Sequence, residues 1–452
     1  MQPTAGEADV MSPPARERVR HALVGAGARA EMFVRALALD HADTAELVAF
    51  ADVNQTRMDA HNRWLAELGR SPVPTYTAGD FTAMLAKERV DVALVTSVDA
   101  THDEYVTAAL RAGCDVIVEK PMTVDAERCR RILDAVAETG RRVTVAFNYR
   151  YNPLHEQVRR LLADGAVGEI GSVHFEWLLD VRHGADYFRR WHRDKSVSGG
   201  LLVHKSGHHF DLVNWWLDAR PVEVHAYGRL FFYGAHGRRH GYARDYDRAH
   251  GSPAADGDPF ALRLADHPRL RELYLDAEAE DGYHRDRNVF APGVTIEDDL
   301  AVLARYDTGA TMTYHLTAYA PWEGYRVMVN GSRGRLELEV TESDHVSPSV
   351  AGALKGAALH GDEAAVERGA ARLTLRPFWA PPVQIPVEGW TRRGHGGADT
   401  RMTRVLLGGE PDPLGRAATA RDGALALLTG LAANRSLETG APTRVADLLT
   451  LP

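Results

Sequence analysis

The 452-residue sequence predicts an α/β protein: a domain built on a parallel sheet, then an α+β domain with a large, mostly antiparallel open sheet. Two observations predict this class. Between residues 18 and 149, short apolar runs alternate with segments of helical spacing, as is typical of a doubly wound sheet with helices on both faces. After residue 150, strand-like runs follow one another with Gly and Asn at hairpin positions, which favours antiparallel pairing.

The elements of the first domain follow from buried runs and amphipathic segments. The expected strands cover residues 21–27, 46–53, 91–97, 114–121 and 141–150. The expected helices cover residues 30–39, 55–69, 80–90, 102–113 and 126–140. Short connections and right-handed crossovers favour a doubly wound order, although periodicity alone does not fix the strand order.

The second domain is expected to start with a helix at 152–165. The later elements are strands at 171–182, 222–234, 298–309, 311–320 and 325–340 and helices at 198–218 and 421–440. Two stretches, near 234–293 and 341–390, lack a sustained period and are expected as insertions, which are often lids, binding loops or interface arms. The predicted organisation is a flexible tail at 1–17, a nucleotide-binding domain at 18–149 and a substrate and oligomerisation domain at 150–452.

Composition excludes several classes of protein. Lys and Arg number 53 against 62 Asp and Glu, so the net charge of −9 argues against a general nucleic-acid binder. Two cysteines, Cys114 and Cys129, cannot build a disulfide scaffold, and they indicate a reducing compartment. The first twenty residues lack the apolar core of a signal peptide, and no apolar run approaches the ~20 residues that span a bilayer. We therefore expect a cytoplasmic protein without membrane or nucleic-acid partners.

A glycine-rich turn follows the first expected strand and opens the first expected helix. The run from Gly25 to Ala30 fits the pattern G-x-G-x-x-G/A, in which the glycines allow a tight turn and let the backbone approach a pyrophosphate. Asp52 ends the second strand, where a carboxylate accepts hydrogen bonds from a ribose 2′-hydroxyl. NAD is therefore the expected cofactor, and Arg57, which is able to reach a 2′-phosphate, leaves NADP open. The residues expected at the cofactor are Gly25, Gly27, Ala28, Arg29, Ala30, Asp52 and Val53.

Several further segments match one family. The turn VGAGARA, the segments SVDATHDEYVTAAL, VEKPMTVDAE and VAFNYRYNP, the motif SGGLLVHKSGHHFD and the C-terminal ARDGALALLTGLAANRSLETGAP all have counterparts there. On these motifs the chain resembles the Gfo/Idh/MocA oxidoreductases over residues 20–230 and 294–452. The resemblance implies a Rossmann domain, a substrate domain with an open sheet, and a homodimer or homotetramer. It also implies hydride transfer between NAD(P) and a secondary hydroxyl or carbonyl of a sugar, cyclitol or glycoside, with Ser97, His102, Glu119 and Lys120 near the cofactor.

Dehydrogenation of a hydroxyl needs a base and a donor that polarises the oxygen. By resemblance, Lys120 touches the reacting hydroxyl, and a positively charged nicotinamide beside it would lower its pKa. His208 is the expected base. His204 stands where the family usually has Asp, so it is expected to bind substrate, orient His208 or take over proton transfer. On one continuous helix, His204 and His208 would share a face with Asp211 and Trp215.

Other side chains are candidates for sugar contact, because sugars stack on aromatic rings and bind planar polar groups. Packing in the core or in an interface is an equally plain explanation for each of them. Asp399, in a glycine-rich loop with His395, is expected to border the site. The substrate-binding candidates are Lys120, Asn148, Arg150, Tyr187, Trp191, His204, Lys205, His208, Trp322 and Tyr325.

Three alternatives remain open at this point. Histidines four residues apart, such as His204 and His208, are able to chelate a metal, but the hydride chemistry needs none, so no metal is expected. A redox-neutral glycosidase or epimerase would use the same residues through a transient keto-sugar with a recycled cofactor. A sugar- or nucleotide-sensing protein would share the fold without catalysis.

Overall fold

The sheet of the first domain contains seven strands in the order β15-β6-β5-β4-β1-β2-β3, in a computed structural model that describes residues 18–346, 369–391 and 394–451. The strands are β1 (Val19–Val24), β2 (Ala45–Asp52), β3 (Thr75–Thr77), β4 (Val92–Val95), β5 (Asp115–Val118), β6 (Val143–Val145) and β15 (Ala418–Thr419). The helices are α1 (Ala30–Arg35), α2 (Gln55–Glu67), α3 (Phe81–Lys87), α4 (His102–Arg111) and α5 (Ala126–Thr139). The predicted Rossmann-type domain is confirmed, and the predicted tail at 1–17 lies outside the described residues.

Apolar layers cover both faces of this sheet. Ala22 and Val24 of β1 enter one apolar cluster, while Leu23 enters another, because successive side chains of a strand point to opposite faces. All neighbouring strands are parallel except β15, which runs antiparallel to β6. The sheet therefore includes a short strand from the C-terminal part of the chain, which the sequence did not predict. Strand β6 ends at Val145 rather than at residue 150, because the chain turns into a 3-10 helix at Asn148–Tyr151.

The second sheet contains nine strands in the order β14-β13-β12-β11-β7-β10-β9-β8-β16. Strands β7 and β10 are parallel and the other neighbours are antiparallel, so the predicted open sheet is confirmed. The strands are β7 (Ile170–Asp180), β8 (Pro221–Arg229), β9 (Asp299–Tyr306), β10 (Thr311–Ala320), β11 (Glu323–Gly331), β12 (Gly334–Ser343), β13 (Ala370–Pro377), β14 (Val383–Ile385) and β16 (Thr443–Arg444). The helices are α6 (Pro153–Ala163), α7 (Val181–Arg189), α8 (Lys195–Ser198), α9 (Leu201–His204), α10 (Ser206–Leu217), α11 (Pro268–Leu270), α12 (Glu278–Asp281), α13 (Ala398–Leu406) and α14 (Ala420–Thr439).

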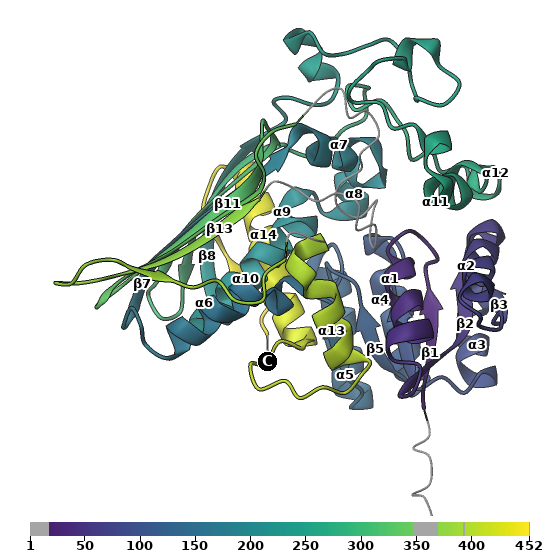
Figure 1. The fold of residues 1–452 in the computed structure, drawn as a ribbon, viewed down its shortest axis with the longest axis horizontal. Coiled ribbons are helices and arrows are strands. Elements are labelled where there is room, and N and C mark those ends of the chain that lie inside the picture. The colour runs from purple at the N-terminus through teal and green to yellow at the C-terminus, as the bar shows by residue number, and fades with distance from the viewer. Residues whose placement is uncertain (1–17, 347–368, 392–393, 452) are drawn as a thin grey trace, which may run out of the picture.

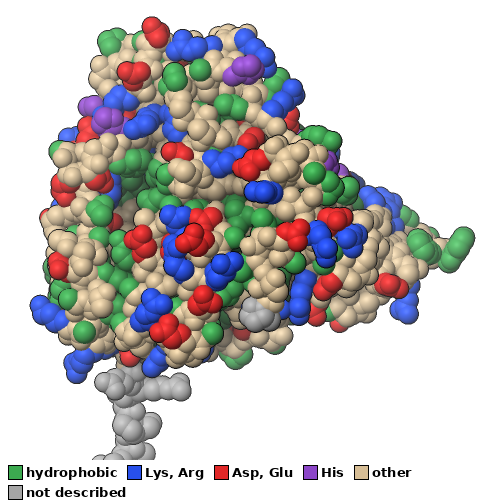
Figure 2. Space-filling view, turned by 180° about the vertical axis from the view of Figure 1, so that it is seen from behind, with side chains coloured by type: hydrophobic (Ala, Val, Ile, Leu, Met, Phe, Trp, Pro, Cys, Tyr) green, Lys and Arg blue, Asp and Glu red, His purple; other side chains and the backbone are tan. Residues whose placement is uncertain are grey.

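Helices cover one face of this sheet (Figure 1), where α14 lies against β8 and α10. On β10, Met312 and Tyr314 are buried in alternation with more exposed neighbours. Leu303 of β9 and Tyr227 of β8 remain exposed. The sheet thus has one packed face and one open face, as expected for antiparallel sheets. The face of the molecule shown in Figure 2 carries acidic and basic side chains interspersed rather than a patch of one sign.

Two expectations for the second domain need correction. The predicted helix at 198–218 is broken, because Gly199 and Gly200 adopt left-handed backbone angles and a second break at Lys205 separates α9 from α10. The stretch 341–390 is not irregular throughout, because its described part contains the end of β12 and all of β13 and β14. The alternating residues 370–377 find hydrogen-bonding partners on β12, and residues 347–368 lie outside the described residues.

The stretch 234–293 forms short helical turns with no strand of its own. Its later part, with α11 and α12, lies against α2 of the first domain (Figure 1). Leu264 and Tyr274 share an apolar cluster there with Trp64 of α2. The insertion therefore reaches from the second domain back to the nucleotide-binding domain. Among the described residues, no helix combines the length and apolarity that crossing a membrane requires.

Candidate active site

A cavity of about 490 Å³ lies where the carboxyl ends of the first domain's strands face the second domain. Open α/β sheets bind their ligands at this edge. Its lining comes mainly from the glycine turn with the ends of β2, β4 and β5, from Asn148 and Tyr149 after β6, from the segment between α7 and α10, and from the insertion. The lining includes Gly25, Asp52, Asp99, Lys120, Tyr187, Trp191, His204, His208, Tyr274 and Asp281.

The glycine turn fits a dinucleotide. Gly25 has φ of +97°, and a Cβ placed there would lie 2.4 Å from the backbone nitrogen of Ser97, so only glycine permits this close approach. The carboxylate of Asp52 accepts hydrogen bonds from the backbone nitrogens of Ala26 and Asn54 and borders the same cavity. Backbone N–H groups, a helix start and a carboxylate at the second strand form the donor and acceptor set that holds a pyrophosphate and a ribose.

Lys120 projects into the cavity directly after β5. Its Nζ lies 3.1 Å from Nε2 of His204 and donates a hydrogen bond of 3.2 Å to the His204 carbonyl oxygen. Burial lowers the pKa of the Lys120 ammonium to about 8, while the charges of Asp99 and Glu119 oppose this shift. The lysine is therefore able to exchange a proton near neutral pH.

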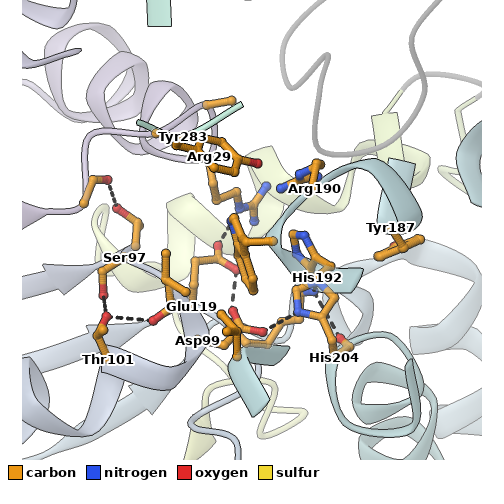
Figure 3. A pocket seen from close by; sticks show the side chains of 18 of the residues that line it. Arg29, Ser97, Asp99, Thr101, Glu119, Tyr187, Arg190, His192, His204 and Tyr283 are labelled. Carbon is orange, nitrogen blue, oxygen red and sulfur yellow. Dashed lines mark hydrogen bonds and ion pairs between the residues drawn. The ribbon is translucent and has the colours of Figure 1, made fainter. Parts of the chain in front are cut away.

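His204 connects Lys120 to a carboxylate, and Figure 3 shows His204 beside Asp99. Its Nδ1 lies 2.5 Å from Oδ2 of Asp99. Burial and the charge of Lys120 hold the pKa of His204 well below its usual range, which favours the neutral ring. Burial raises the pKa of Asp99, and the charge of Lys120 opposes that shift. A neutral imidazole that donates through Nδ1 to Asp99 keeps Nε2 as an acceptor for Lys120. Asp99, His204 and Lys120 thus form a continuous hydrogen-bonded chain.

A second network fixes the residue before Lys120. The guanidinium of Arg29 contacts Glu119 at 2.5 Å and Asp399 at 3.2 Å. Asn148 donates to Asp399 at 2.8 Å. These contacts connect the first helix, the end of β5 and α13 behind Lys120. Asp399 therefore borders the site, while the side chain of His395 is not among those described.

His208 and Lys205 line the cavity beside Tyr149. The ring of His208 stacks on Tyr149 with centroids 4.4 Å apart. Lys205 donates to the Tyr149 hydroxyl at 3.0 Å, and its Nζ lies 4.7 Å from the ring centroid of Trp177. Burial lowers the pKa of Lys205, and its Nζ lies within cation–π range of the rings of Tyr149 and Trp177.

Further aromatic rings line the cavity beside His204. Trp191 stacks on His192 with centroids 3.6 Å apart, and His192 meets His204 at 4.2 Å. Tyr187 also lines the cavity, and Arg190 next to it forms an ion pair of 2.7 Å with Asp186. Figure 3 shows His192 and His204 side by side, with Tyr187 and Arg190 around them.

Most of the site residues predicted from the sequence meet in this cavity. Those that line it are Gly25, Gly27, Ala28, Arg29, Asp52, Val53, Ser97, Glu119, Lys120, Asn148, Tyr187, Trp191, His204, Lys205 and His208. Ala30 and His102 stand behind the lining: Ala30 begins α1, and His102 contacts the carbonyl oxygens of Ser97 and Pro121.

Three predicted substrate contacts lie elsewhere. The Tyr325 hydroxyl meets Nε2 of His155 at 2.8 Å, and its ring stacks on Trp177. Trp322 contacts Arg326 on the sheet. Arg150 forms a two-bond ion pair with Asp211, at 2.6 and 2.8 Å. The expected helical face is therefore divided: His204 and His208 line the cavity, whereas Asp211 and Trp215 do not.

The Arg150–Asp211 pair is expected to support the fold. Both side chains are at most 3% exposed, so Asp211→Ala leaves a buried guanidinium without its main partner. We expect this change to lower the free energy of unfolding by ~3–5 kcal/mol. Asp115→Ala, which breaks an ion pair with the exposed Arg142, should cost only ~0–1 kcal/mol. Urea unfolding measures both, and equal losses would contradict the structural role.

The histidines of α9 and α10 do not converge on one point. His204 contacts Asp99 and Lys120, while Nδ1 of His209 meets the Tyr314 hydroxyl at 2.7 Å. Within residues 18–346, 369–391 and 394–451, no group of three His, Cys, Asp or Glu side chains is arranged to hold a metal ion.

Sequence reasoning missed several residues of the cavity. Asp99 lies in one of the family motifs, but its contact with His204 joins residues 105 positions apart. Tyr149 directly precedes the predicted Arg150, and nothing in the sequence distinguishes its ring from an aromatic side chain of the core. Tyr274, Asp281 and Tyr283 come from the insertion, whose sequence shows no period that would point to the cavity.

The fold and the cavity define an oxidoreductase with an NAD-binding Rossmann domain, and comparisons with known proteins agree. A model described as "Oxidoreductase family, NAD-binding Rossmann fold" matches residues 19–147. A second, "Oxidoreductase family, C-terminal alpha/beta domain", matches residues 159–445. The chain belongs to the Gfo/Idh/MocA oxidoreductase family, as its motifs suggested.

Individual relatives carry related names. The chain is 36% identical to "Putative oxidoreductase YteT" of Bacillus subtilis over 68% of its own length and 73% of that protein. It is 31% identical to "Inositol 2-dehydrogenase" of Rhizobium meliloti over 51% of its length and 63% of the relative. The WlbA dehydrogenase of Bordetella pertussis, solved in complex with NADH and UDP-GlcNAcA, shares the fold with a TM-score of 0.62 at 19% identity, over 96% of this chain and 100% of that one.

Proposed function

We propose that the protein is an NAD-dependent dehydrogenase that moves a hydride between nicotinamide and a secondary hydroxyl or carbonyl of a sugar, cyclitol or glycoside. The observation that carries this proposal is the chain from Lys120 through His204 to Asp99, in the same cavity as the glycine turn. Members of the family named as inositol dehydrogenases support the substrate class.

Lys120 is the proposed proton acceptor. Bound nicotinamide dinucleotide supplies the hydride acceptor for the carbinol carbon. In its neutral form, Lys120 takes the hydroxyl proton of the substrate, and in the reverse direction its ammonium returns that proton to the carbonyl oxygen. His204 accepts a hydrogen bond from Lys120 and orients it, while Asp99 fixes the tautomer of the ring. His208, the base expected from the sequence, lines the same cavity and remains the alternative base.

The remaining lining suits a polyhydroxylated substrate. Tyr187 and Trp191 offer ring faces on which the apolar face of a sugar stacks. Asn148 and Lys205 supply donors for hydroxyl groups within the same cavity. Homodimer or homotetramer formation stays a prediction from the family resemblance.

The first test is NADH absorbance when purified protein and NAD⁺ meet a panel of free sugars, cyclitols and glycosides. We expect NADH in stoichiometric amount to the oxidised product with at least one member of the panel. Product formed without NADH would instead support the redox-neutral glycosidase or epimerase. Absence of both NADH and product across the panel, with NAD bound, would count against the proposed function.

A further inference from the structure

Residues 262–283 of the insertion, here called the nucleotide arm, dock on the nucleotide-binding domain. Leu262, Leu264, Leu270, Leu273 and Tyr274 pack against Ala28, Ala60 and Trp64 in one apolar cluster. The hydroxyl of Tyr274 accepts a hydrogen bond of 2.9 Å from the backbone nitrogen of Ala28, in the glycine turn. The arm therefore forms part of the nucleotide site of this chain.

The end of the arm places a carboxylate on the start of α2. Glu280 accepts hydrogen bonds from the backbone nitrogens of Gln55 at 2.6 Å and Thr56 at 3.0 Å, and from the Thr56 hydroxyl. The hydrogen bond from Thr56 holds the pKa of Glu280 below its usual value. Because α2 begins three residues after Asp52, these N–H groups are next to the ribose-binding carboxylate. They are the donors that an added phosphate on the ribose would otherwise use.

Asp281, the next residue of the arm, contacts Arg57, the side chain that left NADP as an alternative cofactor in the sequence analysis. Asp281 forms an ion pair of 2.7 Å with Nη1 of Arg57, and Asp52 lies 3.8 Å from the same atom. Nε of Arg57 donates to the carbonyl oxygen of Leu273 at 2.9 Å. The guanidinium is also within cation–π range of the arm's tyrosines, Tyr274 at 5.5 Å and Tyr283 at 6.0 Å.

One buried nitrogen of Arg57 lacks a partner within the part of the chain that the structure describes, which indicates a ligand at this place. Arg57 is 8% exposed, and its Nη2 is buried without a hydrogen-bond partner among the described residues. Asp52, Arg57 and Asp281 all line the cavity. A neutral ribose hydroxyl is able to accept a hydrogen bond from Arg57 and donate one to Asp52. A 2′-phosphate would lie near three carboxylates, those of Asp52, Glu280 and Asp281, and near a single guanidinium. Placing like charges together lowers the affinity.

We propose that the nucleotide arm makes this site selective for a dinucleotide with a free ribose 2′-hydroxyl, with Glu280 and Asp281 as specificity-determining residues. Asp281 neutralises Arg57, and Glu280 occupies the donors of α2. The inference rests on the dinucleotide site of the proposed function, but it concerns cofactor binding alone. It holds or fails independently of which substrate is turned over.

The test measures the dissociation constants of NAD⁺ and NADP⁺ by calorimetry, without substrate. We expect the unchanged protein to bind NAD⁺ ~100-fold more tightly than NADP⁺, as the cost of placing like charges together implies. In the double variant Glu280→Gln/Asp281→Asn, the ratio of the NADP⁺ dissociation constant to the NAD⁺ dissociation constant should fall at least ~10-fold, mainly through tighter NADP⁺ binding. Each single substitution should shift the ratio in the same direction, which keeps the test valid if the double variant does not fold.

The matched control is Glu272→Gln, on the same arm. Glu272 accepts a hydrogen bond from Nε1 of Trp64 at 2.9 Å and does not line the cavity. This change should leave the ratio of the NADP⁺ and NAD⁺ dissociation constants unchanged. Equal affinity of the unchanged protein for NAD⁺ and NADP⁺, or an unchanged ratio in the single and double variants, would overturn the proposal. Failure of the substrate panel with a normal NAD⁺ preference would instead overturn only the proposed dehydrogenase.

Discussion

Lys120→Ala is expected to lower kcat/KM for substrate oxidation by ~10³-fold, because general acid–base catalysis by one positioned side chain contributes about that much. Binding of NAD⁺ should persist, since Gly25 and Asp52 hold the other end of the cofactor site. Steady-state kinetics with the substrate found in the panel, together with NAD⁺ calorimetry, measures the two effects separately.

The pH dependence of the oxidation rate gives a second expected result for Lys120. The neutral amine is the proton acceptor in oxidation, and burial sets the pKa of Lys120 at about 8. Oxidation should therefore accelerate as the pH rises through about 8, and reduction of the carbonyl should slow over the same range. The rise should be absent in Lys120→Ala.

A control separates this loss from a general effect of removing a lysine. Lys87 lies on the last turn of α3 over Tyr76 and does not line the cavity. Lys87→Ala should keep both the rate and the pH profile. If Lys120→Ala keeps more than a tenth of the activity, ~10-fold or less being too little for a lost acid–base group, proton transfer by Lys120 is wrong and His208 becomes the leading base.

The first domain was predictable because local patterns in its sequence indicate its strands and helices. Strands buried on both faces read as short apolar runs, and helices with caps read as amphipathic segments. Asp125, for example, caps α5 by accepting a hydrogen bond from the backbone nitrogen of Arg128, and Gly140 ends the helix in a left-handed conformation. Strand β15 escaped prediction because its two residues pair with β6 from the far end of the chain.

The site was only partly predictable. Lys120, His204 and His208 were found through family motifs, but the continuous helix expected for the two histidines ignored the pair Gly199–Gly200 and the break at Lys205. The roles of Asp99 and of the nucleotide arm depend on contacts between distant segments. No local periodicity encodes such contacts, so the most specific features of this site required the structure.

Asp99→Asn is expected to lower kcat for oxidation by ~10²-fold and to move the pH profile. The amide still offers an oxygen to Nδ1 of His204, so the ring keeps a hydrogen-bond partner at the same position. What is lost is the negative charge, which raises the pKa of Lys120. Without it, the pKa of Lys120 falls, and the rise of activity with pH should move to lower pH.

The direction of this shift separates a positioning role for Asp99 from a purely structural one. A variant that is merely less stable would lose activity at every pH and keep the midpoint of the profile. Asp115→Asn, which alters a carboxylate paired with the exposed Arg142 outside the cavity, should change neither quantity. In a His204→Ala background, Asp99→Asn should still move the midpoint to lower pH, because the charge of Asp99 acts on Lys120 through space. If Asp99→Asn moves the midpoint upward or not at all, the chain from Asp99 to Lys120 does not tune the proton acceptor.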